Sequence, residues 1–281
     1  MTKLLQPGQN YVSPVFNEDN SSNYRLSIGL SLDGFSFLVM DEKDVVVMIN
    51  SVSFQANTEW NLLLPELKDY LSKFSWLKSE MKKKVAMIDT TRFTIMPFSL
   101  YDSRQKKTYL ALNHPVNEND LIREDILKVH YAYLLYAVNQ DLFDTVNALI
   151  PGLSWQHYAN ALANSCEDSQ ADVLKVDIRY NRFYVLAFSK QKLKFCNAFR
   201  YRSKEDFVYF IVLVYKQLGL DPEAIHVQLS GLIRQDSEVV RLLQRYVKNV
   251  SFGDIELIGG NEDSDDTCFA FQYENFKRAV S

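Results

Sequence analysis

The chain has 281 residues, of which 47% are hydrophobic and 23% are charged, as expected for a folded globular protein and not for a disordered or fibrous one. The formal net charge of -4 is too small to imply a partner attracted by the field of the whole molecule. Glycine is scarce, with only 9 residues, which counts against the glycine-lined loops that commonly bind phosphates.

Cysteine usage and the apolar runs bear on the compartment. Cys166, Cys196 and Cys268 are odd in number and form no CxxC pair, so a disulfide framework is not predicted. The first residues contain no apolar segment of the signal-peptide kind, and the longest apolar run, 207–215, is too short to cross a bilayer. We therefore expect a soluble, cytoplasmic protein with no membrane partner.

The first half reads as three strands followed by alternating helices and strands. Residues 1–23 form a polar tail, and the alternation that follows predicts an antiparallel meander with a type I′ turn at Asp33–Gly34. Helical spacing begins at Leu62, although Pro65 would kink this helix or mark its start. The predicted elements in chain order are strands 24–31, 35–42 and 45–52, helix 62–74, strand 83–89, helix 99–112, strand 131–138 and helix 141–149.

The second half repeats this order. Ser203 and Asp206 have the spacing of a capping box, and Gly219 stands where a helix C-cap belongs. The predicted elements are strands 173–180, 182–189 and 192–199 in a meander, helix 203–218, strand 225–230, helix 237–247, strand 252–258 and a helical tail from Cys268. An internal duplication follows, with a first lobe over 1–152 and a second over 153–281, each of the order βββαβαβ.

Particular segments of the chain resemble those of a known protein superfamily. Residues 225–247, IHVQLSGLIRQDSEVVRLLQRYV, look like the strand, adenosine-binding turn and helix of the actin, sugar-kinase and heat-shock-chaperone superfamily. More narrowly, the chain resembles an uncharacterised bacterial family of the actin-like ATPase fold, with matching segments at 24–42, 92–102 and 133–138. The resemblance implies an α/β protein of two ribonuclease H-like lobes in tandem.

The resemblance also implies where a nucleotide would bind. Catalytic members carry an Asp-x-Gly turn in each lobe, where backbone amides approach the phosphates and the carboxylate holds a metal-bound water. In the first lobe these positions fall on Gly29 and Ser31, and in the second lobe Asp177 is present but Arg179 replaces the glycine. We therefore expect a pseudo-ATPase with no catalytic residue and no cofactor. The alternative is ATP with magnesium, bound by Asp177 and by Ser230–Gly231 at the adenosine turn.

Other chemistry finds no support in the sequence. The four histidines show no HExxH or paired spacing, and no GxSxG or GxGxxG motif is present, so we expect no metal and no nucleophilic or hydride-transfer enzyme. A ribonuclease H-type nuclease needs several converging carboxylates, whereas each lobe offers one near its strand ends, Asp89 and Asp177. The acidic run 261–266 lacks the glycine and terminal glutamate of a calcium loop.

Basic and aromatic residues concentrate in the second lobe. Residues 171–204 contain nine Lys or Arg and only two Asp. Strand alternation is expected to point the lysines of 192–199 outward. A polyanion such as RNA, or an acidic protein, could bind there, although a solvated sheet face is the simpler interpretation. The candidate polyanion-binding residues are Arg182, Lys192, Lys194 and Arg202.

Three functions remain open at this stage. The first is a non-catalytic interaction or scaffold protein whose protein partner the sequence does not identify. The second is a nucleotide-binding switch with ATP between the lobes. The third is an RNA-associated factor that uses the basic sheet of the second lobe.

Overall fold

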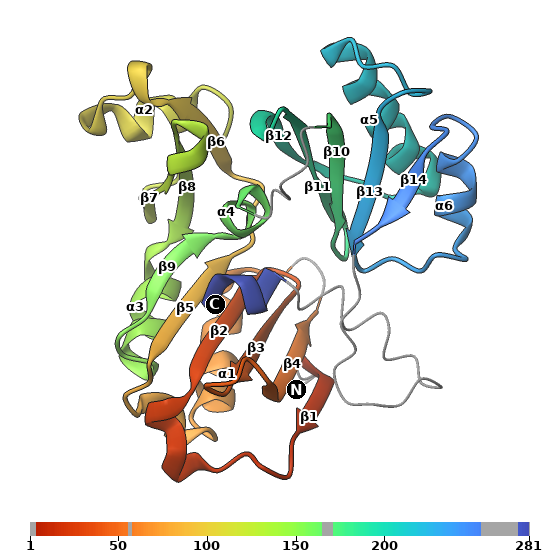
Figure 1. The fold of residues 1–281 in the computed structure, drawn as a ribbon. Coiled ribbons are helices and arrows are strands. Elements are labelled where there is room, and N and C mark those ends of the chain that lie inside the picture. The colour runs from red at the N-terminus through yellow and green to blue at the C-terminus, as the bar shows by residue number, and fades with distance from the viewer. Residues whose placement is uncertain (1–3, 56–57, 165–170, 254–274, 281) are drawn as a thin grey trace. The chain divides into compact units, whose positions relative to one another are not determined.

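The computed structural model describes residues 4–55, 58–164, 171–253 and 275–280 (Figure 1). These residues form mixed α/β structure, as the sequence predicted. No helix among them is long and apolar enough to cross a membrane. The bounds of the strands are β1 Leu5–Val12, β2 Arg25–Ser31, β3 Gly34–Met40, β4 Val46–Phe54, β5 Lys83–Ile88, β6 Phe93–Pro97, β7 Asp120–Leu127, β8 Ala132–Asn139, β9 Ser154–His157, β10 Val173–Ile178, β11 Arg182–Ser189, β12 Lys192–Arg200, β13 His226–Gly231 and β14 Val250–Phe252. The helices are α1 Trp60–Leu71, α2 Lys106–Ala111, α3 Gln140–Leu149, α4 Tyr158–Ala163, α5 Lys204–Leu218 and α6 Glu238–Leu243, and residues 275–280 form a further, C-terminal helix.

The chain divides into two compact units. Unit 1 comprises residues 1–161 together with 275–281, and unit 2 comprises 162–274. This division differs from the lobe boundary at 152/153 because β9 and the C-terminal helix group with unit 1. A buried hydrogen bond holds that helix there: the Asn275 side-chain amide donates to the Tyr158 hydroxyl at 2.9 Å.

The large sheet of unit 1 has the order β1-β4-β3-β2-β5-β9. Its three central antiparallel strands are those predicted by alternation, and β5 joins β2 in parallel. Ile28, Leu30, Phe35 and Phe37 are fully or almost fully buried, and the two phenylalanines contact aromatic rings of α1 and the turn after it. Since side chains alternate along a strand, Ser27 and Gly29 lie on the opposite face.

Two predictions for this sheet were wrong. Residues 1–23 are not merely a polar tail, because β1 pairs antiparallel with β4 at the sheet edge. The segment LQPGQNYV lacks apolar alternation, so its strand character comes from main-chain hydrogen bonds and not from buried side chains. Strand 131–138 is also not the last strand of this sheet. That place belongs to β9, which runs parallel to β5.

The strand predicted at 131–138 instead centres a second, three-stranded sheet in unit 1. β8 pairs antiparallel with β6 on one side and with β7 on the other. The long helix predicted over 99–112 is also shorter than expected, since only α2 is α-helical and 3₁₀ turns precede it. We call β6, β7, β8 and α2 the small-sheet region.

Unit 2 follows the sequence prediction closely. Its sheet has the order β12-β11-β10-β13-β14, with the first three strands antiparallel and the last two parallel to β10. At the start of α5 the Ser203 hydroxyl accepts from the Asp206 amide at 3.1 Å, and Gly219 ends the helix at a φ of 64°. The predicted strand 252–258 begins earlier, at Val250, and its residues beyond 253 lie outside the described part of the chain, as does the tail from Cys268 up to 274.

Candidate functional site

Gly29 lies on β2 where the resemblance places the phosphate-binding carboxylate of the first lobe. The Phe276 ring of the C-terminal helix, itself fully buried, sits against it. A Cβ at position 29 would overlap Phe276 Cζ and would lie 2.8 Å from Cε1, closer than real Cβ atoms approach. Glycine here makes room for the aromatic ring, so an aspartate could enter only by displacing Phe276.

The turn after β2 uses its polar groups locally. The Ser31 hydroxyl accepts from the Asp33 amide at 3.1 Å and lies 3.4 Å from the Gly34 carbonyl. Ser31 pairs with Gly34, so Leu32 and Asp33 are the central turn residues. Neither Asp33 nor Gly34 has a positive φ, which makes the type I′ prediction wrong.

The three residues proposed for nucleotide binding in the second lobe come together in unit 2. Asp177 on β10 stands opposite Ser230 on the parallel strand β13, and Ile178 stands opposite Gly231. Asp177 is buried and its Oδ2 accepts from the Ser230 hydroxyl at 2.8 Å. The carboxylate therefore takes part in a contact between strands.

Gly231 and Arg179, which lie next to Asp177 and Ser230, both take part in backbone contacts of the sheet. Gly231 has a φ of 84°, and a Cβ there would overlap the Ile178 carbonyl oxygen and lie 2.7 Å from the Ile178 nitrogen. The Arg179 amide donates to the Arg182 carbonyl at 2.8 Å within the β10–β11 hairpin. The backbone amide that an Asp-x-Gly turn would direct at a phosphate is thus used by the hairpin.

The candidate polyanion-binding residues do not form one exposed set. Lys192, Lys194 and Arg202 are exposed, but Arg182 is buried, with 5% of its surface accessible. The expectation that Arg182 offers an exposed cation was wrong. Almost every residue of β11 is buried because this strand lies inside the sheet, between β10 and β12, and alternation along one strand does not reveal that both of its faces are covered.

A buried polar cluster that the sequence did not indicate links the two sheets of unit 1. Asp125 on β7 accepts from the His157 backbone amide at 2.6 Å and from the Tyr136 hydroxyl at 3.2 Å. Burial raises the pKa of Asp125 to about 7, against the opposing effects of these hydrogen bonds and of Arg123. His157 accepts from the Ala159 amide through Nδ1 at 3.0 Å, so its Nε2 donates to the Thr90 carbonyl at 2.8 Å.

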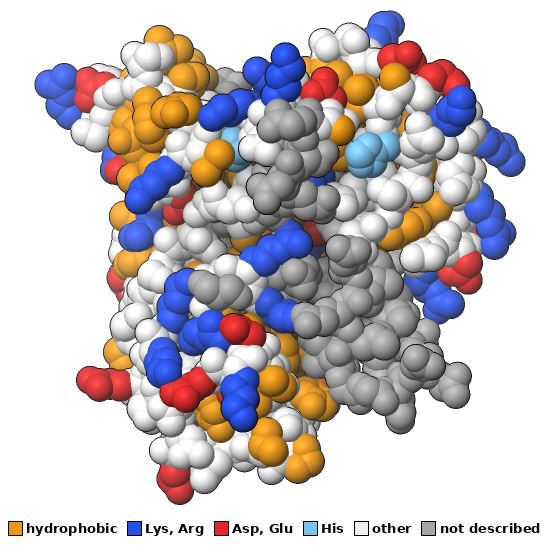
Figure 2. Space-filling model, viewed as in Figure 1, with side chains coloured by type: hydrophobic (Ala, Val, Ile, Leu, Met, Phe, Trp, Pro, Cys, Tyr) orange, Lys and Arg blue, Asp and Glu red, His pale blue; other side chains and the backbone are white. Residues whose placement is uncertain are grey.

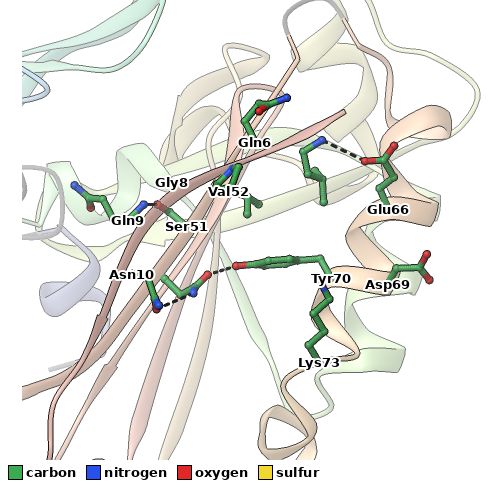
Figure 3. A pocket seen from close by; sticks show the side chains of 13 residues that line it. Gln6, Gly8, Gln9, Asn10, Ser51, Val52, Glu66, Asp69, Tyr70 and Lys73 are labelled. Atoms are coloured by element: carbon green, nitrogen blue, oxygen red, sulfur yellow. Dashed lines mark hydrogen bonds between the residues drawn. The ribbon is translucent and has the colours of Figure 1, made fainter. Parts of the chain in front are cut away.

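A cavity of about 480 Å³ separates the edge strand β1 from α1 (Figure 3). At one end Glu66 accepts from the Leu4 amide at 3.0 Å, and at the other the Tyr70 hydroxyl donates to Asn50. Burial raises the pKa of Tyr70. Strand residues of β1 and β4 line one side of the cavity, and Glu66, Asp69, Tyr70 and Lys73 line the other. Glu66 is bonded to a backbone amide and Tyr70 to Asn50, so these two groups stabilise the contact between β1, β4 and α1.

The described ranges do not bring together side chains that could bind a metal ion. They contain no group of three or more His, Cys, Asp or Glu side chains that could hold a metal ion. Asp89 follows β5 directly and is buried, and its amide donates to the Leu30 carbonyl at 2.8 Å. Neither unit therefore assembles a two-metal nuclease centre from its described residues.

Comparison with known proteins identifies the family. A model described as "Protein of unknown function (DUF3822)" matches residues 13–250. The chain belongs to the DUF3822 family. No curated protein matched the sequence.

Two solved structures share the fold of this DUF3822 member. A Bacteroides thetaiotaomicron protein with actin-like ATPase fold and unknown function is 21% identical, with a TM-score of 0.76 over 85% of this chain and 94% of that one. A chain of the PilM–PilN type IV pilus biogenesis complex is 10% identical, with a TM-score of 0.56 over 91% of this chain and 97% of that one. The predicted family and the actin-like ATPase fold are confirmed.

Proposed function

We propose that this DUF3822 protein is a non-catalytic interaction or scaffold protein built on the actin-like ATPase fold. The observation that carries the proposal is the Phe276 ring against Gly29, which fills the place of a phosphate-binding carboxylate. An aromatic ring offers neither the negative charge that holds magnesium nor a donor for a phosphate oxygen.

The second unit supports the same conclusion by a different contact. Asp177 is bonded to Ser230, and the Arg179 amide is bonded within its own hairpin. The residues present do not fit ATP with magnesium in the manner the fold family implies, and no reaction step is assigned to them. The fold is also compatible with assembly, since one similar structure is a chain of the PilM–PilN complex.

A nucleotide-binding switch is the second candidate, favoured by one observation. Asp177, Ser230 and Gly231 meet at neighbouring strand ends, as the resemblance requires of an adenosine and phosphate site. Ser230 could rotate to release the carboxylate. Binding without turnover would be the signature of this function.

A polyanion-binding factor has weaker support. Lys192, Lys194 and Arg202 are exposed in unit 2, but the burial of Arg182 reduces the proposed patch. A triple change to Glu should reduce RNA binding and its salt dependence if the patch is functional. Equal binding by the triple variant and the unchanged protein would exclude this function.

Phosphate release from ATP and GTP with magnesium tests the main proposal. The purified chain should release no phosphate above a protein-free control, because at the two positions of the Asp-x-Gly turns Gly29 replaces the carboxylate and the Arg179 amide is bonded to Arg182. Asp177→Ala should give the same result. Turnover that disappears in Asp177→Ala would contradict the proposal and identify a working catalytic site.

A further inference from the structure

Exposed hydrophobic side chains concentrate on the small-sheet region of unit 1. Six of the fourteen strongly exposed large hydrophobic residues in the described chain lie between residues 98 and 131. Figure 2 shows hydrophobic side chains gathered over the part of the molecule that Figure 1 labels α2, β6 and β8. Such a concentration on a soluble protein marks an interaction surface more often than scattered exposure does. The six are Phe98, Leu100, Leu112, Ile126, Val129 and Tyr131.

Strand register explains how part of this set becomes continuous. Met96, Tyr133 and Ile126 stand directly opposite one another across β6, β8 and β7, so their side chains share one face. The Phe98 ring continues the row, with its centroid 4.8 Å from that of Tyr133. The Tyr131 ring also lies edge-on to Phe98, with centroids 6.4 Å apart. We call Met96, Phe98, Ile126, Tyr131 and Tyr133 the aromatic strip.

A helix of this chain already covers the other half of the same face. The next row on the sheet contains Leu135 and Glu124, which pair across β8 and β7. Lys106 of α2 lies over that row, with its Nζ 3.1 Å from Glu124 Oε2, and Leu110 of α2 is fully buried. Tyr101 of this chain stacks on Tyr133, with ring centroids 3.9 Å apart, and Met96 and Tyr133 are half-buried. The uncovered part of the strip is therefore formed by Phe98, Ile126 and Tyr131, on a small sheet that already packs against one helix, which is a geometry that a second helix would fit.

Charges around the strip favour an acidic partner. Lys107 on α2 and Lys128 just after β7 are exposed. The acidic groups on this side are engaged, Asp102 with Arg104 and Glu124 with Lys106. Exposed Glu118 precedes β7, at the end of that strand away from Ile126 and Lys128.

We propose that the aromatic strip binds an amphipathic helix of a partner protein, with apolar residues on one face and acidic residues along its flanks. This inference rests on the proposed function and specifies the surface and the kind of partner. A membrane surface is a poorer match, because lipid-binding patches usually carry roughly four to eight cations, more than the two exposed lysines and the Asp102-paired Arg104 here. A helix instead supplies apolar side chains at the spacing of the strip, and acidic flanks would pair with Lys107 and Lys128.

Fluorescence anisotropy with labelled peptides tests the proposal on the full chain. The probe is a helical peptide of about 18 residues with leucines at i, i+3, i+4 and i+7 and glutamates on both flanks. The same peptide with lysine flanks and a scrambled sequence serve as comparison probes. The acidic peptide should bind at least about tenfold more tightly than either, because both the apolar face and the flanking charge contribute.

Matched variants assign the binding to the strip. Ile126→Asp should weaken binding of the acidic peptide at least about tenfold, whereas Leu62→Asp, which places an aspartate on the exposed side of α1, should not. Lys107→Glu with Lys128→Glu should also weaken it, and Lys68→Glu with Lys78→Glu should leave it unchanged. Tryptophan fluorescence of each variant verifies folding, since Trp60, Trp76 and Trp155 all lie in unit 1.

Four results would overturn the proposal. These are no peptide binding, equal binding of the acidic and lysine-flanked peptides, strip-dependent self-association in sedimentation without peptide binding, and strip-dependent pelleting with phosphatidylserine vesicles in place of peptide binding. None of them bears on phosphate release, so failure here is distinguishable from failure of the non-catalytic function.

Discussion

The large sheet of unit 1 and the sheet of unit 2 have the same order of five strands. They differ in the residues that stand near the end of the first strand of each meander. Counted from the first strand of the meander, both sheets have the order 3-2-1-4-5, with β1 as an extra edge strand in unit 1. At the first strand of the meander, unit 1 has Gly29 under an aromatic ring, and unit 2 has Asp177 bonded to Ser230. The comparison shows that this topology depends on the apolar rows and ladders, whereas the groups at the strand ends can change independently.

Phe276→Ala is the strongest test of the contact in unit 1. Removal of a fully buried phenylalanine should cost about 3–5 kcal/mol of unfolding free energy. Urea unfolding followed by tryptophan fluorescence reports on unit 1 alone, since all three tryptophans lie there. Leu62→Ala, at an exposed side chain of α1 in the same unit, is the control. A cost below about 1 kcal/mol would show that the ring does not fill this place.

Asp125 should make unit 1 pH-dependent. Its pKa is raised to about 7 in the folded state, so folding favours the protonated acid, and stability should fall as pH rises from about 4 through about 7. The full loss is at most about 4 kcal/mol. The same fluorescence assay at each pH should show this slope in the unchanged protein and not in Asp125→Asn. Parallel curves for the two proteins would mean that Asp125 titrates normally.

Two glycines of unit 2 separate backbone strain from steric overlap. Gly231 and Gly219 both have positive φ, but a Cβ would overlap the backbone only at Gly231. Gly219→Ala should cost about 1 kcal/mol, and Gly231→Ala clearly more, about 2–3 kcal/mol. Urea unfolding followed by circular dichroism gives both values. Equal costs would mean that the close approach of β13 to Ile178 is not rigid.

Substitutions in the β11–β12 hairpin should change the free energy of unfolding least, and should increase it instead of lowering it. Lys190 and Gln191 have φ values of 49° and 62°, the pattern of a type I′ turn without its preferred residues. Lys190→Asn with Gln191→Gly should stabilise the protein by about 1 kcal/mol in the same assay. The matched change at Leu32 and Asp33, where φ is not positive, should bring no gain. Equal gains at both turns would refute the conformational explanation.

The elements that the sequence predicted well are those whose signals are local. The meanders of both sheets alternate along each strand, and α5 is marked by Ser203 at its start and Gly219 at its end. β1 and β9 escaped prediction because they are defined by hydrogen bonds to distant strands and their sequences, LQPGQNYV and SWQH, show no apolar alternation.

The candidate site was predictable only in part for the same reason. Damage to the Asp-x-Gly positions is visible in the sequence at Gly29 and Arg179, and strand pairing places Asp177 beside Ser230 as the resemblance suggested. The contact between Phe276 and Gly29 joins residues far apart in the sequence, and no local sequence pattern predicts it. The burial of Arg182 likewise depends on what covers both faces of a sheet, which alternation along one strand does not contain.

Calorimetric titration of the full chain with ATP and magnesium tests the central claim most directly. Both Asp-x-Gly positions in the described part of the chain are altered, at Gly29 and at Arg179, so the injections should give only heats of dilution up to millimolar ATP, for the unchanged protein and for Asp177→Ala alike. A saturable isotherm with one ATP per chain, lost in Asp177→Ala, would contradict the account and establish a nucleotide-binding protein.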